Sequence, residues 1–133
     1  MRLDQINHVA ILVRDYAKSR AFYVDTLGFD VLAEHHRPER GDIKLDLAAG
    51  QVRLEIFGPD PQVAAAQVPP ERPSYPEAAG LRHLAFTVQD IEASVAELER
   101  QGVRVEPIRR DSFTGEKMTF FFDPDGLPLE LHE

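Results

Sequence analysis

The sequence contains no cysteine and no tryptophan, and it has fewer basic than acidic residues. The lack of cysteine excludes disulfide frameworks, thiolate zinc sites, cysteine nucleophiles and iron–sulfur clusters. The formal net charge of −8 argues against binding to nucleic acids or to anionic membranes, which both need clustered positive charge. No apolar run approaches the ~20 residues of a membrane span, and the N-terminus does not resemble a signal peptide. We therefore expect a cytoplasmic protein.

An internal repeat runs through the chain of 133 residues. The segment Ile6–Asp15 reads like Leu81–Asp90, and His8 and His83 lie 75 residues apart within them. The same offset relates further pairs: Ala10 and Ala85, Val13 and Val88, Ser19 and Ser94, Leu54 and Leu129, Glu55 and Glu130. It also aligns the alternating apolar residues Ile43, Leu45 and Leu47 with Met118, Phe120 and Phe122. The sequence therefore predicts two copies of one structural unit.

Each copy predicts a strand, a helix and three further strands. In the first copy these elements are expected over residues 8–14, 16–27, 30–35, 43–48 and 51–57. In the second copy they are expected over residues 83–89, 91–101, 104–109, 117–122 and 127–131. Asp15 and Asp90 stand where an N-cap residue would begin each helix. The fold is thus predicted to be α+β, with two tandem βαβββ modules.

A proline-rich connector separates the two modules. Residues 58–80 contain six of the ten prolines, which argues against a strand or a long helix there. We expect a single domain over residues 1–133, with the first module at 4–57, the connector at 58–80 and the second module at 81–133.

Two histidines and two glutamates occupy matching places in the predicted modules. His8 and His83 lie early in the first strand of each copy, and Glu55 and Glu130 lie late in the last strand. Carboxylates within apolar strand runs are costly unless they are paired or bind a metal. If the modules face each other across a pseudo-twofold axis, the four side chains converge into a site for Zn²⁺, Ni²⁺, Mn²⁺ or Fe²⁺. Alternatively, the histidines are hydrogen-bonded surface residues and the glutamates lie on a solvated sheet face.

Three stretches of the chain resemble the vicinal oxygen chelate superfamily: Ile6–Ala10, Arg20–Phe29 and Asp123–Leu131. This superfamily includes glyoxalase I, extradiol dioxygenases, methylmalonyl-CoA epimerase, fosfomycin-modifying enzymes and bleomycin-binding proteins. The chain is most similar to a bacterial subgroup of glyoxalase-like proteins. The resemblance implies that the two modules form a curved sheet cup around one site, and it implies a homodimer.

The order of the metal ligands in glyoxalase I is His, Glu, His, Glu, which the resemblance carries onto His8, Glu55, His83 and Glu130. Methylmalonyl-CoA epimerase has Gln at the second place, dioxygenases and fosfomycin enzymes use three ligands, and bleomycin-binding relatives lack the set. The resemblance therefore implies one divalent metal ion per site, with Glu130 as the base and Glu55 moving the proton on the other face. The Arg and Asn that help to hold glutathione in bacterial glyoxalase I are replaced here by Leu12 and Pro59. A glutathione substrate is not implied.

These observations favour a metal-dependent, glyoxalase I-like lyase or isomerase that acts on a small molecule with vicinal oxygens through an enediolate-type intermediate. The alternatives are a metal-free protein that binds or sequesters a small molecule, and an iron-dependent enzyme of the dioxygenase type.

His35 and His36 point to opposite faces of a strand and cannot easily hold one ion together, whereas His132 shares a face with Glu130. A negative charge on the substrate could bind to one of five basic residues, although each of them is also typical of a solvated surface. These residues are Arg37, Arg40, Arg53, Arg109 and Lys117.

Overall fold

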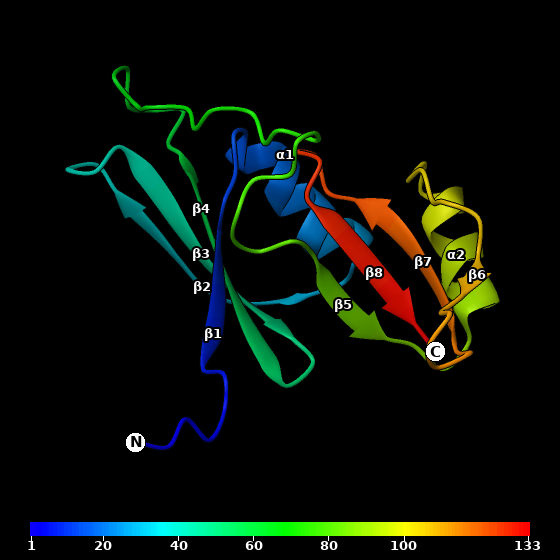
Figure 1. Ribbon diagram of the computed structural model, residues 1–133. Coiled ribbons are helices and arrows are strands. Elements are labelled where there is room, and N and C mark those ends of the chain that lie inside the picture. The colour runs from blue at the N-terminus through cyan, green and yellow to red at the C-terminus, as the bar shows by residue number, and fades with distance from the viewer. The chain divides into compact units, whose positions relative to one another are not determined.

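In the computed structural model, which describes residues 1–133, the chain forms two units, Met1–Glu71 and Arg72–Glu133. Each unit contains an open four-stranded sheet, with two consecutive helical segments in the first unit and one helix in the second (Figure 1). The predicted α+β fold with two βαβββ modules is confirmed. No helix is long and apolar enough to cross a membrane.

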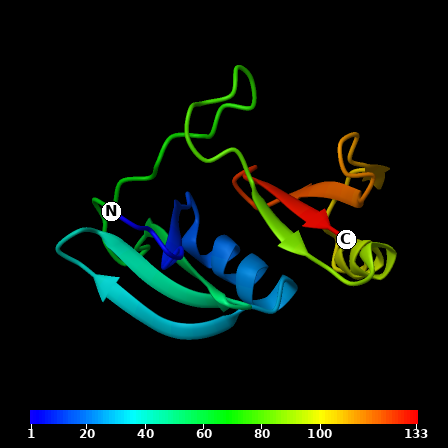
Figure 2. The ribbon, with the colours of Figure 1, turned by 60° about the horizontal axis from the view of Figure 1, so that its bottom comes forward.

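The first unit builds its sheet around a central antiparallel pair of strands. Its elements are β1 (His8–Leu12), the helical segments α1 (Tyr16–Arg20) and η1 (Ala21–Thr26), β2 (Asp30–Arg37), β3 (Asp42–Ala49) and β4 (Val52–Pro59). The strand order is β1-β4-β3-β2, with β1 parallel to β4 and the other pairs antiparallel. The helix lies across one face of this sheet (Figure 2). Between them, Leu45, Leu47, Ile56 and Tyr23 are fully buried.

The helix of the first unit has the predicted extent but changes its hydrogen-bond pattern. Asp15 caps its start as predicted, accepting a bond of 3.0 Å from the backbone N–H of Lys18. Beyond Ala21 the helix widens into a π-helix, in which the N–H of Leu27 donates to the carbonyl of Phe22, five residues back, at 2.9 Å.

The second unit repeats the topology of the first. Its elements are β5 (Leu84–Thr87), α2 (Ile91–Arg100), β6 (Arg109–Arg110), β7 (Lys117–Phe122) and β8 (Pro128–His132). The strand order is β5-β8-β7-β6, again with a parallel first pair. Apolar side chains from α2 and from the sheet make the core of this unit, which includes Ile91, Leu98, Phe121 and Leu129.

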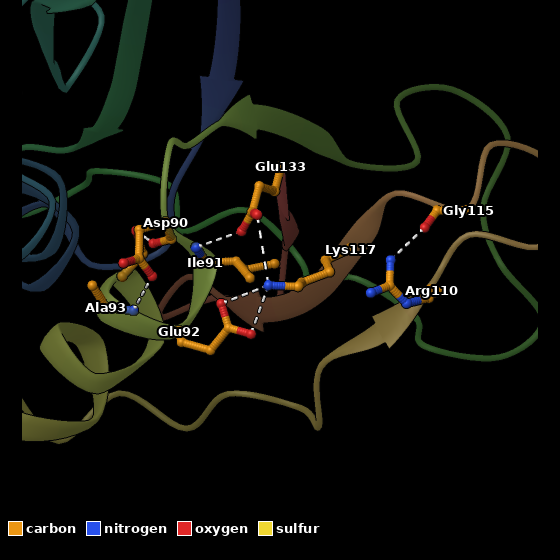
Figure 3. A network of polar contacts seen from close by, with 9 residues as sticks. Asp90, Ile91, Glu92, Ala93, Arg110, Gly115, Lys117 and Glu133 are labelled. Carbon is orange, nitrogen blue, oxygen red and sulfur yellow. Dashed lines mark hydrogen bonds and ion pairs between the residues drawn. The ribbon is translucent and has the colours of Figure 1, made fainter.

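The start of α2 is tied to the last residue of the chain by polar contacts (Figure 3). Asp90 accepts a bond of 2.8 Å from the N–H of Ala93, which confirms the predicted cap. Glu133 accepts a bond of 2.9 Å from the N–H of Ile91. Lys117 donates to Glu92 at 2.8 Å and lies 3.6 Å from Glu133. These ion pairs give Lys117 a structural role that the sequence did not indicate.

The strand predicted over residues 104–109 is wrong for most of its length. Only Arg109–Arg110 form a strand, and Val105 makes an isolated bridge to Phe121. Pro107 lies in the middle of this stretch and cannot donate a ladder hydrogen bond. The hydroxyl of Thr119 instead donates to the carbonyl of Glu106 at 2.6 Å and holds the segment against β7.

The repeat slips by one residue in the third strand of the second module. Leu47 stands opposite Leu54, but it is Phe121, not Phe122, that stands opposite Leu129. The predicted alignment of Ile43, Leu45 and Leu47 with Met118, Phe120 and Phe122 is therefore wrong. Since side chains alternate between faces, the slip exchanges the core and site faces of β7.

The turn that follows β7 accounts for the slip. In the first unit Ala49 pairs with Val52 across two turn residues. In the second unit Asp123 and Leu127 close a turn of three residues, with the N–H of Asp123 donating to the carbonyl of Leu127 at 3.1 Å. The carboxylate of Asp123 also accepts the N–H groups of Asp125 and Leu127. The extra turn residue shifts every side chain of β7 by one place.

Gly58 marks the closest approach of β4 to the helix of the first unit. A Cβ atom placed on Gly58 would lie 2.8 Å from Cγ2 of Val13, 3.0 Å from Cβ of Tyr16 and 3.2 Å from its Cα. Two of these three atoms belong to or adjoin the helix backbone, so a rotamer change cannot relieve the contact.

We expect Gly58→Ala to lower the free energy of unfolding by about 1–3 kcal/mol, because the helix must move off the sheet. Urea denaturation measures the change. Gly50→Ala measures the cost of backbone strain alone, because Gly50 has open space around it and its φ of +61° costs a side chain about 1–2 kcal/mol. If Gly58→Ala leaves the free energy of unfolding unchanged, the close approach is wrong.

Candidate metal and substrate site

The second unit brings His83 and Glu130 together. Glu130 lies in the middle of β8, opposite Phe120, and its side chain is 9% exposed. Its Oε2 lies 2.9 Å from Nε2 of His83, and its Oε1 lies 3.9 Å from Nε2 of His132. No lysine or arginine pairs with this carboxylate. A buried carboxylate flanked only by imidazoles is suited to binding a cation.

The first unit brings His8 and Glu55 together in the corresponding place. Glu55 is buried in β4, and its Oε2 lies 3.7 Å from Nε2 of His8. Nδ1 of His8 lies 2.9 Å from the side-chain oxygen of Asn7, which can only accept. Asn7 thus contacts the Nδ1 side of the ring, while Nε2 faces the carboxylate of Glu55.

Glu55 differs from Glu130 because it has a cationic partner. Nζ of Lys44 lies 2.9 Å from Oε1 of Glu55 and 3.0 Å from Oδ1 of Asp46. Asp46 is buried and stands directly opposite Glu55 across β3 and β4. Hydrogen bonds to Glu55 and then to Asp46 raise the pKa of Lys44 above its ordinary value. Lys44 thus offsets the repulsion between two facing carboxylates.

Lys44 and Asp46 are site residues that the sequence reasoning missed. The signal was present, because both alternate with the buried residues Ile43, Leu45 and Leu47 and so share one face of β3. Their contact with Glu55 depends on the register of β3 and β4, which the residues of β3 alone do not give. The residue opposite Glu130 is Phe120, so the second unit has a ring where the first has Asp46.

A cavity of about 630 Å³ lies in the second unit, over the face of the sheet that carries Glu130. His83 and Glu130 line it, together with the apolar side chains Met118, Phe120 and Phe122. The ring of Phe120 meets that of His83 edge to face, with centroids 5.3 Å apart. Phe120 and Phe122 are therefore cavity residues.

A smaller cavity of about 470 Å³ lies in the first unit, near the end of β4. Its lining includes Leu12, Phe57 and Pro59, the first and last of which stand where glutathione-binding residues would be. Arg37 lies over the ring of Phe57, 4.9 Å from its centroid, and pairs with Asp42 at 2.6 Å. Arg37 is thus committed to partners within its own unit.

Each predicted histidine–glutamate pair lies within one unit, and neither unit by itself gathers three or more side chains that could hold a metal ion. Of the remaining histidines, His35 and His36 lie in β2, and Nδ1 of His36 lies 3.0 Å from Oδ2 of Asp60. His132 lies in β8 beside Glu130, as predicted. The imidazole and carboxylate that each unit provides are ligand types that suit a divalent ion such as Zn²⁺, Ni²⁺, Mn²⁺ or Fe²⁺.

Residues 5–131 match the family model of the Glyoxalase/Bleomycin resistance protein/Dioxygenase superfamily, and the chain therefore belongs to this vicinal oxygen chelate superfamily. The uncharacterised protein YwkD of Bacillus subtilis is 54% identical over 135 residues, which cover 100% of this chain and 99% of YwkD. The uncharacterised protein YaeR of Escherichia coli is 53% identical over 132 residues, covering 98% of this chain and 97% of YaeR. The crystal structure of SMU.1112c is 59% identical with a TM-score of 0.96, covering 99% of this chain and 100% of that one.

Several more distant relatives are enzymes. They include bovine methylmalonyl-CoA epimerase, 29% identical over 98% of this chain and 75% of the epimerase. Glutathione transferase FosA of Serratia marcescens is 32% identical over 98% of this chain and 81% of its own length. The structure of glyoxalase I from Leishmania major is 27% identical, with a TM-score of 0.70, over 98% of this chain and 87% of that one. Members of the superfamily commonly bind small molecules, use a divalent metal ion and form dimers.

Proposed function

We propose that the protein is a divalent-metal-dependent, glyoxalase I-like lyase or isomerase. Its substrate would be a small molecule with vicinal oxygens, which reacts through an enediolate-type intermediate. The observation that carries this proposal is the buried carboxylate of Glu130, which lines a cavity, lies 2.9 Å from His83 and has no lysine or arginine partner.

The residues proposed to hold the ion are His8, Glu55, His83 and Glu130, whose donors suit Zn²⁺, Ni²⁺, Mn²⁺ or Fe²⁺. The bound ion would act as a Lewis acid that polarises two adjacent substrate oxygens. Superfamily members often form dimers, and we propose a homodimer here.

The chain's own residues would move the proton. Glu130, as the general base, takes a proton from the substrate carbon next to a carbonyl group. Glu55 moves the proton on the other face of the substrate: it takes one from solvent and delivers it to the neighbouring carbon, while Glu130 releases its proton to solvent. Lys44, 2.9 Å from Oε1 of Glu55, holds that carboxylate in position. Phe120 and Phe122 line the cavity and reduce the access of water to the reacting carbon.

A second candidate is a metal-free protein that binds a small molecule. The antibiotic-binding protein TnmS3 from Streptomyces favours it, with 25% identity and a TM-score of 0.72 over 99% of this chain. The buried carboxylate of Glu130 argues against this second candidate, because a site that binds a small molecule through apolar contacts alone would not need a charged group there.

The test combines metal analysis with a substrate screen. We expect about one divalent ion per chain in protein purified without chelators, and turnover of methylglyoxal with at least one small thiol after loading with Ni²⁺ or Zn²⁺. A chelator should abolish the turnover, and added metal should restore it. Because Leu12 and Pro59 replace the glutathione-binding residues, a thiol other than glutathione is expected to give the highest rate. Failure to bind stoichiometric metal under any loading would contradict the proposal and favour the metal-free binding protein.

A further inference from the structure

Three arginines line the cavity of the second unit, and two of them are occupied by protein partners. These arginines are Arg72, Arg82 and Arg109. Arg72 donates to the carbonyl of Leu81 at 2.7 Å, and Arg82 makes two bonds to the carboxylate of Glu77, at 2.8 and 2.9 Å. Their guanidinium groups therefore serve to hold the local chain.

Arg109 is positioned by protein contacts that leave most of its N–H groups available to a ligand. Its single polar partner is Glu106, through a long contact of 3.3 Å from one of the two Nη atoms. Its guanidinium carbon lies 5.3 Å from the centroid of the Phe120 ring, and the same ring contacts His83. Phe120 thus lies against both His83 and the guanidinium of Arg109.

Such an arrangement is suited to binding an anion. A guanidinium held on a ring has lost part of its conformational freedom, so less is lost when it binds a ligand. Its remaining N–H groups form the fork that matches a carboxylate. Of the nearby acidic groups, Glu106 makes the single long contact with Arg109, Glu77 pairs with Arg82, and Asp111 accepts the N–H groups of Phe113 and Thr114.

We propose that Arg109 determines substrate specificity by binding a carboxylate that the substrate carries at the end away from its vicinal oxygens. This inference rests on the proposed function, because it places the vicinal oxygens at His83 and Glu130. The apolar rings of Phe120 and Phe122 line the same cavity and suit a short hydrocarbon spacer between the two polar ends. The substrate class is therefore a compact ω-carboxylate with two adjacent oxygens.

The test uses hydroxamic acids, whose two adjacent oxygens chelate metal ions. Succino-, glutaro- and adipohydroxamic acid end in a carboxylate, and alkyl hydroxamic acids of the same length end in a methyl group. We measure their binding to Ni²⁺-loaded protein by calorimetry. At least one carboxylate ligand should bind about tenfold more tightly than its methyl-ended partner, the usual size of one charge-assisted hydrogen bond.

Arg109→Gln should remove this preference and leave the affinity of the methyl-ended ligands unchanged. Arg110→Gln is the matched control, because Arg110 is the adjacent residue and donates to the carbonyl of Gly115 instead (Figure 3). Equal binding of both ligand series to the parent protein would overturn the inference, and so would a preference that survives Arg109→Gln. If no hydroxamic acid binds the metal-loaded protein, the proposed function itself fails, and the inference with it.

Discussion

Glu130→Gln should weaken the binding of Ni²⁺ or Zn²⁺ by more than the 10–100-fold that is typical when a residue behind the ligands is lost. It should also reduce turnover by about 10²–10⁴-fold, the usual contribution of a general base. The substitution keeps the size of the side chain, removes its charge, and replaces one of the two acceptor oxygens with an amide group that donates. Equilibrium dialysis measures the metal affinity, and a steady-state assay of loaded protein measures the turnover.

A loss of function in this variant should not come from unfolding. In metal-free protein, the buried carboxylate of Glu130 has imidazole neighbours but no lysine or arginine. Removing that charge relieves a desolvation cost, so we expect the apo form of Glu130→Gln to be at least as stable as the parent. Glu116→Gln is a suitable control, because Glu116 is exposed and lies 3.4 Å from His132. A folded Glu130→Gln variant that binds metal as tightly as the parent would show that Glu130 is not a ligand.

Glu55→Gln should weaken metal binding less than Glu130→Gln does. Lys44 already neutralises part of the charge on Glu55 and Asp46, so the first unit attracts a cation less strongly through this carboxylate. Comparing the metal affinities of the two variants shows whether Glu55 and Glu130 contribute equally, as their equivalent places in the repeat would indicate.

The module order and both histidine–glutamate pairs could be predicted because they depend on strands that keep the repeat. His8 begins β1 and His83 directly precedes β5, while Glu55 and Glu130 lie in β4 and β8, and the offset of the two copies is unchanged in the parallel pairs β1–β4 and β5–β8. Caps at Asp15 and Asp90 could be predicted for a local reason, since a carboxylate before a helix meets free N–H groups whatever surrounds it.

The face that β7 presents could not be predicted from its own residues. Five of its six residues are apolar or threonine, so its pattern does not say which side is buried. The register depends on the length of the turn at Asp123, one residue longer than its counterpart in the first unit. The roles of Lys44 and Asp46 were hidden for a related reason, because a cross-strand ion pair appears only when the register of two strands is known.

The largest stability effect is expected from Phe121→Ala. Phe121 is 1% exposed and stands opposite the fully buried Leu129. Removing its ring leaves a cavity among core side chains, which costs about 3–5 kcal/mol. That loss is a large part of the 5–15 kcal/mol that stabilises a typical domain, and urea denaturation should detect it readily.

Phe122→Ala is the matched control, because it removes the same ring from the next position of the same strand. Phe122 is 39% exposed and lines the cavity, so its loss should change the free energy of unfolding by about 1 kcal/mol or less. An uninterrupted repeat would place Phe122, with Leu47, in the core and would predict the opposite order of the two effects. Measuring both variants therefore decides which face of β7 packs against α2. A larger loss of unfolding free energy in Phe122→Ala than in Phe121→Ala would show that Phe120 and Phe122 do not line the cavity. The ring of Phe120 would then not support Arg109.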